Sequence, residues 1–247
     1  MKITFCGTSH GYAEKNRFQS LTVIEKGDCY YLLDAGAPVE WVMINNDMSF
    51  DKIRGIFITH MHNDHVGALS NVIEPMLRYR YNDKSVCYMP CEAGLEGFLN
   101  WMTVLGNSRE KVTETVKFGI TKEGKVFEDG NISVYARQTN HISGDSDSFA
   151  YIFEAEGKRI LFTGDMSQGF GEYPEITNGE HFDMVVCEMA HANLSDVADM
   201  LKETDTERMY IHHYHMPRLK GYEEILKTFP FEVTVLKDGD VVTSGNN

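Results

Sequence analysis

The sequence predicts an α/β protein in which layered sheets are covered by helices. Short β-type runs recur along the whole chain of 247 residues, and helical patterns stand between several of them. Strands come first and strands mixed with helices follow, an order typical of layered α/β architecture. Neither a linker rich in Pro or Ser nor a low-complexity segment interrupts the chain. We therefore expect one domain over residues 1–247.

The expected strands are short runs rich in β-branched and aromatic residues. They cover residues 2–6, 21–25, 30–34, 55–59, 85–89, 132–136, 148–153, 159–163, 184–188, 208–212 and 231–236. Gly27-Asp28 predicts a tight hairpin between the second and third runs. Helical spacing predicts helices over residues 38–46, 69–81 and 95–105. A further helix, capped by Asn193 or Ser195, would carry Val197, Met200 and Leu201.

Composition and charge exclude several classes of protein. Hydrophobic residues make up 42% of the chain and charged residues 24%, which excludes disorder, collagen and coiled coil. The chain has 23 Lys and Arg against 37 Asp and Glu, a formal net charge of −14. Such a surface does not attract polyanions as a whole. Structured nucleic acid is therefore not the favoured partner.

The cellular location follows from what the sequence lacks. No run approaches the roughly 18 apolar residues that a membrane-spanning helix needs, and residues 1–11 (MKITFCGTSHG) show no secretory signal. The five cysteines are an odd number without a dense framework: Cys6, Cys29, Cys87, Cys91 and Cys187. They fit free thiols in a reducing compartment better than disulfides. We expect a cytoplasmic protein without a membrane partner.

A cluster of metal-ligand residues follows the expected strand at residues 55–59. Three imidazoles and one carboxylate lie within residues 60–65: His60, His62, Asp64 and His65. On extended backbone, side chains two residues apart project to the same side, so His60 and His62 can bind one ion. Asp64 and His65 follow as the chain turns and can reach a second ion. Clusters with this spacing indicate a metal site.

Further candidate ligands stand just past other apolar runs. His141, Asp165 and His213 each follow or end an expected strand. Asp165 can bridge two cations because a carboxylate has two oxygens. His212 and His215 flank His213, so the register at this point remains open between the three histidines.

The segment 59–65 (THMHNDH) resembles the HxHxDH motif of the metallo-β-lactamase superfamily, and residues 33–36 (LDAG) resemble its first acidic motif. The similarity runs from Phe5 to about Arg218. It implies an αββα sandwich with a two-metal site at one edge of the sheets. By that pattern one ion takes His60, His62 and His141, the other takes Asp64, His65 and His213, and Asp165 bridges. Asp34 would orient the histidine loop without binding metal.

The resemblance also implies a reaction. Two divalent cations, zinc first and manganese or iron as alternatives, would share a hydroxide that attacks an electrophilic phosphorus or carbonyl carbon. Asp64 is a candidate for the reaction as well as for metal binding. The protein is therefore expected to be a metal-dependent hydrolase.

The opening at residues 7–17 resembles the GTSxGxPxKxRN loop of the tRNA 3′-processing ribonucleases, tRNase Z. Lys15 and Arg17 match this pattern and could hold a phosphate or carboxylate of the substrate, whereas Ala13 and Phe18 replace its Pro and Asn. Residues 186–191 (VCEMAH) resemble that family's Glu and His motifs. His191 is therefore the candidate acid for the departing oxygen, supported by Glu188.

Two departures from tRNase Z point to a smaller substrate. After Met89-Pro90-Cys91 an ordinary helix follows and strand resumes soon after Thr115, which leaves no room for the tRNA-gripping arm. The acidic charge offers no track for tRNA. We expect a phosphodiesterase acting on a small-molecule or nucleotide-type phosphodiester. Many relatives dimerise, so a homodimer is a candidate assembly.

Other functions remain open because they use the same metal ligands. A thioester or lactone hydrolase, like glyoxalase II or the acyl-homoserine lactonases, is the main alternative. An iron-dependent persulfide dioxygenase would use one iron and fewer ligands. A non-enzymatic scaffold is disfavoured because all seven candidate ligands are present: His60, His62, Asp64, His65, His141, Asp165 and His213.

Overall fold

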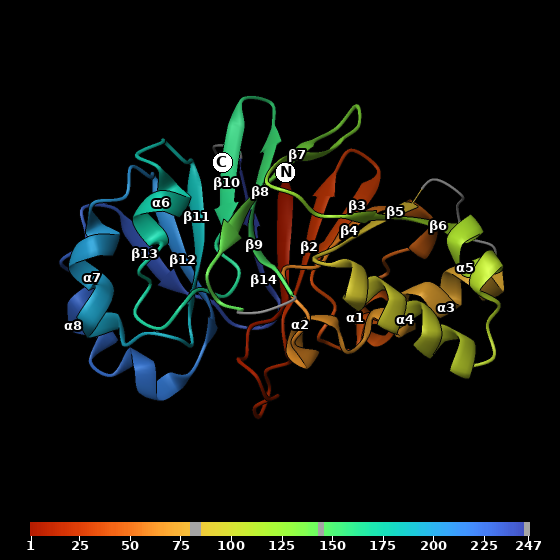
Figure 1. Ribbon diagram of the computed structural model, residues 1–247. Coiled ribbons are helices and arrows are strands. Elements are labelled where there is room, and N and C mark those ends of the chain that lie inside the picture. Colours follow the sequence, from red (N-terminus) through yellow and green to blue (C-terminus); the bar gives the residue numbers. More distant parts are fainter. Residues whose placement is uncertain (80–84, 143–145, 245–247) are drawn as a thin grey trace.

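The structure is a computed structural model that describes residues 1–79, 85–142 and 146–244. Two sheets lie face to face, and the helices gather at the two outer sides, as Figure 1 shows. Each sheet has seven strands within the described part of the chain. This arrangement is the predicted αββα sandwich.

The first sheet combines an antiparallel part with a parallel part. Its strand order is β14 (Asp240–Thr243), β1 (Lys2–Gly7), β2 (Leu21–Lys26), β3 (Cys29–Leu33), β4 (Ile53–Phe57), β5 (Ser85–Met89) and β6 (Val116–Ile120). Strands β14 to β3 are antiparallel, and β3 to β6 are parallel. Parallel strands need crossover connections, and the helices here are α1 (Val39–Asn45), α2 (Asn63–Val66), α3 (Leu69–Tyr79), α4 (Glu92–Val104) and α5 (Arg109–Thr115), with a 3₁₀ turn at Phe50–Lys52.

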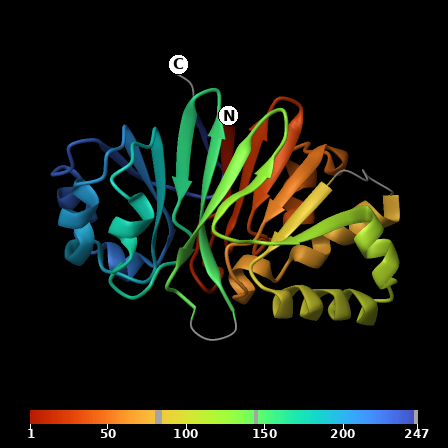
Figure 2. The same ribbon diagram turned by 45° about the horizontal axis from the view of Figure 1, so that its top comes forward.

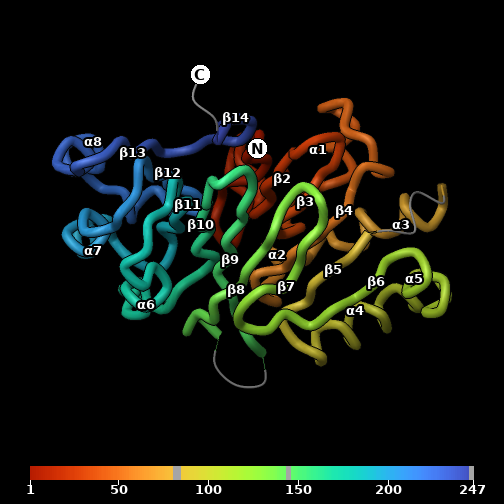
Figure 3. The backbone as a smooth tube through the Cα atoms, turned by 90° about the horizontal axis from the view of Figure 1, so that it is seen from above, coloured from red at the N-terminus to blue at the C-terminus, as the bar shows by residue number. Residues whose placement is uncertain are grey.

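The second sheet repeats this plan. Its order is β13 (Glu232–Val235), β12 (Arg208–Tyr214), β11 (Met184–Met189), β10 (Lys158–Phe162), β9 (Ser148–Ala155), β8 (Ser133–Thr139) and β7 (Gly124–Glu128). Strands β7 to β10 are antiparallel and β10 to β13 are parallel. The crossovers contain α6 (Tyr173–Thr177), α7 (Leu194–Lys202) and α8 (Tyr222–Leu226), with a 3₁₀ turn at Met216–Leu219. Figure 3 shows the first and second halves of the chain side by side, with β14 crossing back beside the N-terminus.

The buried apolar side chains form three clusters. One lies between each sheet and its helices, and the third joins strand residues of both sheets. Figure 2 shows the two sheets facing each other where this third cluster lies. In the third, Phe57 of β4 meets Phe153 of β9 edge to face, with ring centroids 5.4 Å apart. Aromatic pairs of this kind stabilise a core beyond the area they bury. The two sheets therefore share one apolar centre.

Every expected strand lies within or overlaps a strand of the structure, and the Gly27-Asp28 hairpin is confirmed, with Gly27 at a φ of 61°. The sequence prediction missed β7, β14 and α5, which are short and largely exposed, and it missed the short helices α2, α6 and α8 as well. The helix expected from residue 95 begins at Glu92, because the Cys91 thiol accepts a hydrogen bond from Gly94 N. The last two residues expected in the helix over 69–81 lie outside the described residues. Asn193 precedes α7, but its amide donates to Asp196 and does not cap the backbone.

The remaining structural expectations concern thiols and membranes. All five cysteines are free thiols. Among the described residues, no helix has the length and apolar character needed to cross a bilayer.

Strands β4, β8, β10 and β12 end at the same edge of the sandwich, and their loops meet there.

Candidate metal centre

All seven candidate metal ligands meet at this edge. His60 and His62 follow β4, and the short helix α2 carries Asp64 and His65. His141, Asp165 and His213 come from the ends of β8, β10 and β12. The structure sorts them into two groups of donors around Asp165.

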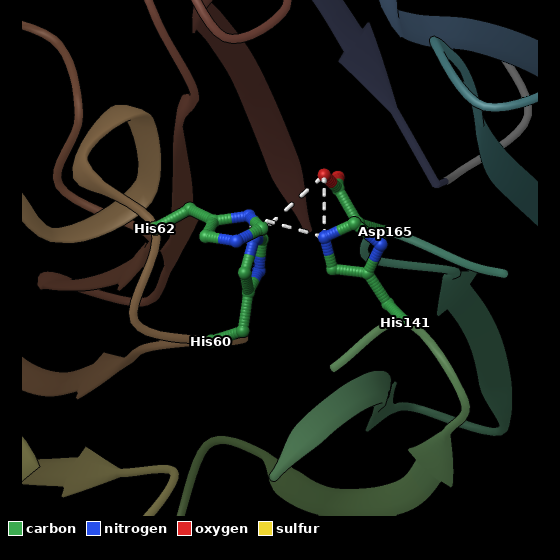
Figure 4. A group of neighbouring side chains, drawn as sticks. All are labelled: His60, His62, His141 and Asp165. Atoms are coloured by element: carbon green, nitrogen blue, oxygen red, sulfur yellow. Dashed lines mark hydrogen bonds and ion pairs between the residues drawn. The ribbon is translucent and has the colours of Figure 1, made fainter. Parts of the chain in front are cut away.

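The first donor group consists of three imidazoles and one carboxylate oxygen. His62 Nδ1 lies 2.9 Å from His60 Nε2 and 3.1 Å from His141 Nε2. Asp165 Oδ2 lies 3.7 Å from the Nε2 atoms of both His60 and His141. Figure 4 shows these side chains pointing toward one another, with His60 and His62 on one segment and His141 and Asp165 on two others.

The second donor group uses the other oxygen of the same carboxylate. Asp165 Oδ1 lies 3.5 Å from His65 Nε2 and 3.3 Å from His213 Nε2. Asp64 Oδ2 lies 3.4 Å from His65 Nε2 and 3.6 Å from His213 Nε2. Asp165 thus faces one donor group with each oxygen.

These groups fit divalent cations. Ligand atoms about 2.0–2.1 Å from a tetrahedral zinc ion are roughly 3.3 Å from one another, which matches the spacings here. His65 Nε2 and Asp165 Oδ1 are buried and have no hydrogen-bond partner among the described residues. Buried polar atoms are normally satisfied, and a cation between the donors would satisfy both.

The segment Asp34-Ala35-Gly36 holds the histidine loop in place. Ala35 N donates to the His65 carbonyl at 2.6 Å, and Ser20 N donates to the Asp64 carbonyl at 3.0 Å. A Cβ atom on Gly36 would lie 1.6 Å from the Asp64 carbonyl oxygen, so only glycine permits this approach. The resemblance to the first acidic motif therefore corresponds to a close backbone contact.

The buried Asp34 carboxylate orients ring and backbone together. Its Oδ2 lies 2.6 Å from His65 Nδ1, and its Oδ1 accepts from Thr59 N at 2.9 Å. Ser20 Oγ donates to the same carboxylate at 3.1 Å. A carboxylate at Nδ1 holds the proton there and leaves Nε2 free as a ligand atom.

Electrostatics favour the cation-binding forms of His60 and Asp165, whereas Asp165 and Asp34 outweigh burial at His65 and raise its pKa well above the ordinary value. Burial lowers the pKa of His60 well below its ordinary value, and the neighbouring His65 adds to this effect. Burial alone would raise the pKa of Asp165, but His213 and His65 outweigh it and hold that pKa well below its ordinary value. A neutral imidazole and an ionised carboxylate are the ligand forms that metal binding requires.

His191 and Glu188 lie beside the first donor group. Glu188 Oε1 is 2.9 Å from His191 Nδ1, and its carboxylate also accepts from the backbone N–H groups of Met166, Ala190 and His191. Burial lowers the pKa of His191, but the Glu188 carboxylate outweighs burial and raises it. The ring centroids of His191 and His141 lie 4.5 Å apart. The structure thus brings together the pair expected from residues 186–191.

One organising residue was missed by the sequence analysis. Glu172 is buried, and its Oε1 accepts from Asn140 N at 3.0 Å and from Ser167 N at 2.8 Å. These backbone groups adjoin His141 and the Asp165 loop. Glu172 stands in a loop without metal-ligand spacing, so only the tertiary structure reveals its position.

The two residues expected to hold substrate differ in environment. Arg17 donates to Thr8 Oγ1, to Glu14 Oε2 and to the Thr8 and Tyr214 carbonyls, and its guanidinium stacks 3.7 Å from the Tyr214 ring centroid. These bonds hold the Arg17 guanidinium within the loop. Arg17 therefore stabilises the loop and is not an open contact for substrate. Lys15 is exposed and forms no ion pair within the described residues.

The structure separates the three neighbouring histidines. His213, at a φ of 45°, reaches the second donor group. His212 is buried, and its ring centroid lies 5.5 Å from that of Phe5. The ring centroids of His215 and His10 lie 4.3 Å apart. Of the three, His213 alone joins the donor groups, as the family resemblance implied.

The fold and this site define a member of the metallo-β-lactamase superfamily. Within it, the chain belongs to the family described as Anti-Pycsar protein Apyc1, whose model matches residues 1–228.

The similar proteins agree with this class. Ribonuclease Z of Limosilactobacillus fermentum is 29% identical over 145 residues, which are 57% of this chain and 46% of that protein. The chain thus spans about half the length of the curated relatives it matches. The metallo-beta-lactamase fold protein YhfI of Bacillus subtilis superposes with a TM-score of 0.77 at 18% identity, covering 98% of this chain and 99% of that one. The short form of human tRNase Z (ELAC1) gives a TM-score of 0.75 at 19% identity, with 100% of both chains covered.

Proposed function

We propose that this protein is a metal-dependent hydrolase that cleaves phosphodiesters with two divalent cations. The observation that carries the proposal is the position of Asp165, whose two oxygens each face a separate donor group. Bridged two-metal sites are common in phosphatases and nucleases. The similarity to ribonuclease Z supports phosphodiesters as the substrate class.

Each donor group would hold one cation. His60, His62 and His141 would hold the first, Asp64, His65 and His213 would hold the second, and Asp165 would contact both. Divalent cations bound there would act as Lewis acids toward a phosphate oxygen and lower the pKa of water. Zinc suits these nitrogen and oxygen donors, as do manganese and iron.

His191 is the proposed acid for the departing oxygen. Glu188 holds the Nδ1 side of the ring at 2.9 Å, which leaves Nε2 to donate a proton. Because Glu188 also raises the pKa of His191, the ring carries a proton over a wider pH range than a free imidazole. Glu188 is a positioning residue in this scheme.

The substrate is proposed to be small and nucleotide-like. Within the described residues 85–142, the chain between β5 and β6 forms only α4 and α5, so no protruding arm stands there to grip a tRNA. The net charge of −14 also disfavours a long polyanion. Lys15, exposed on the loop before β2, is the candidate contact for a terminal phosphate.

A substrate panel tests the proposal. Protein reconstituted with zinc, manganese or iron is assayed on bis(p-nitrophenyl) phosphate, a cyclic nucleotide, precursor tRNA, a thioester and a lactone. We expect metal-dependent hydrolysis of the first two. Turnover of the thioester or lactone alone would instead establish the alternative hydrolase, and turnover of precursor tRNA at a comparable rate would contradict the small substrate.

One variant and its matched control test the role of Asp165 in cation binding. Asp165→Ala should bind fewer cations per chain and lose all hydrolysis, because it removes an oxygen from both donor groups. Asp199→Ala is the matched control, since the Asp199 side chain is 98% exposed on α7. Wild-type turnover in Asp165→Ala would overturn the two-cation site.

The cytoplasmic location and the homodimer remain predictions. The five free thiols support a reducing, cytoplasmic environment. A homodimer is tested by light scattering of the purified protein.

A further inference from the structure

A second set of ligand-type side chains lies outside the centre described above. It consists of His10 and Glu14, from the loop between β1 and β2, and His215, which follows β12. We propose that these three residues bind one additional divalent transition-metal ion of the zinc type. This loop site is separate from the two donor groups around Asp165.

The geometry of the loop site suits a single ion. His10 Nε2 lies 3.2 Å from Glu14 Oε1, and the His10 and His215 rings pack with centroids 4.3 Å apart. One ligand atom from each of the three residues lies within 4.8 Å of the others. Two imidazoles and a carboxylate with a solvent position complete a four-coordinate zinc site.

The loop is already held in the required shape. Ser9 N donates to the Phe18 carbonyl at 2.8 Å, and Ser9 Oγ donates to the Tyr12 carbonyl at 2.7 Å. Arg17 pairs with Glu14 Oε2 at 2.7 Å, which fixes that carboxylate and leaves Oε1 directed toward His10. An ion would therefore order few additional groups when it binds.

Access and competition distinguish the loop site from another group of similar composition. The His10, Glu14 and His215 side chains are half-buried, so an ion reaches them without opening the core. His181, Asp183 and Glu207 also lie close together. There, however, Lys158 Nζ and Arg159 N already bond to Asp183, and His181 pairs with Asp205.

Neighbouring residues on the same strand end serve the two sites. His213 faces Asp64 and Asp165, whereas His215 faces His10. An ion in the loop site would tie the loop before β2 to the end of β12. It would thereby fix the segment that carries His213, which links the loop site to the main centre without sharing a ligand.

Zinc counting tests the loop site. Protein dialysed to equilibrium in a zinc buffer is analysed for zinc per chain, and crystals are examined for anomalous scattering at the zinc edge. We expect three zinc ions per wild-type chain, two in His10→Ala and in His215→Ala, and three in the matched control His181→Ala. An anomalous peak should lie between His10, Glu14 and His215.

A double variant keeps this inference apart from the proposed function. His62→Ala/His65→Ala disables both groups of the main centre and should retain one zinc ion, which His10→Ala added to it would remove. An unchanged zinc count in both His10→Ala and His215→Ala, or no bound zinc in His62→Ala/His65→Ala, would overturn the loop site. Circular dichroism checks that each variant is folded, and the two single variants lie on different segments, so one serves if the other is unfolded.

Discussion

Asp34 and His65 are separated by 31 residues in the sequence, yet Asp34 Oδ2 lies 2.6 Å from His65 Nδ1. The contact fixes which nitrogen of His65 carries the proton. In Asp34→Asn the amide would donate to Nδ1, so that Nε2 would carry the proton and lose its ligand lone pair. We predict that Asp34→Asn weakens cation binding by the second donor group about 10–100-fold.

Competition with a metal-sensitive dye measures this change. Asp129→Asn is the control, because Asp129 accepts from Tyr31 Oη at 2.6 Å, away from the donor groups. Unchanged affinity in Asp34→Asn would show that the Asp34 contact does not set the His65 tautomer.

The proposed acid His191 predicts an effect that depends on the leaving group. His191→Ala should lower kcat by roughly 10²–10⁴-fold on an ester with an alkyl leaving group. The p-nitrophenyl ester should lose much less, since p-nitrophenolate departs without a proton. Parallel kinetics on both substrates, with metal content measured by elemental analysis, test this difference. Equal losses on both esters, or loss of metal, would contradict the acid role.

Glu172 predicts a positioning effect without direct metal contact. Glu172→Leu would leave the N–H groups of Asn140 and Ser167 without an acceptor, at about 1–3 kcal/mol each. We expect lower stability and weaker cation binding by the first donor group. Glu172→Gln keeps an oxygen at this position and should restore most of the binding. Urea unfolding and metal titration of both variants provide the measurement, and failure of Glu172→Gln to restore binding would show that the charge itself is needed.

Glu180 predicts how stability changes in acid. Arg137 and Arg159 each donate to its carboxylate at 2.7 Å. Burial raises the pKa of Glu180, but Arg159, Asn178 and Arg137 outweigh burial and lower it below 4.5. A carboxyl with a lowered pKa in the folded state stabilises the protein above the unfolded pKa, and this contribution is lost as pH falls through the folded pKa.

Glu180→Gln should therefore be less stable than the wild type at pH 7 by up to about 1 kcal/mol, because the group is partly exposed. The difference should disappear as pH falls below 4.5. Urea unfolding at a series of pH values measures it. A difference that persists in acid would assign the effect to packing.

The apolar centre shared by the two sheets predicts one unfolding transition. Its buried residues come from both sheets, including Phe5 and Phe57 from the first and Phe153 and Val186 from the second. Separating the halves would expose this cluster to water. We propose that residues 1–247 form one cooperative domain, and far-UV circular dichroism and tryptophan fluorescence should give the same midpoint in urea. Two midpoints would indicate independent units.

Local sequence was enough to predict much of the fold and the candidate centre. Residues 60–65 form one short continuous segment, so their spacing alone indicates a metal site. The strand ends at His141, Asp165 and His213 could be predicted as candidates because apolar runs precede them. Their sorting into two groups around Asp165 came from the family resemblance and agrees with the distances in the structure.

Contacts between distant segments could not be predicted in the same way. Arg17 donates to the Tyr214 carbonyl across 197 residues, so a residue that looked free for substrate is a brace. Glu172 accepts from Asn140 N across 32 residues, and His10 packs against His215 from the far end of β12, so no local pattern connects these partners. The short strands β7 and β14 depend on pairing with β8 and β1 and not on their own apolar pattern.

The candidate ligands come from both halves of the chain, and this has a consequence for when a cation can bind during folding. His60, His62, Asp64 and His65 come from the half of the chain that builds the first sheet, and His141, Asp165 and His213 come from the half that builds the second. Neither half holds all the residues of either donor group. Tight cation binding by the proposed two-metal centre, and the stability that binding would add, would therefore require that the two halves have first docked in register.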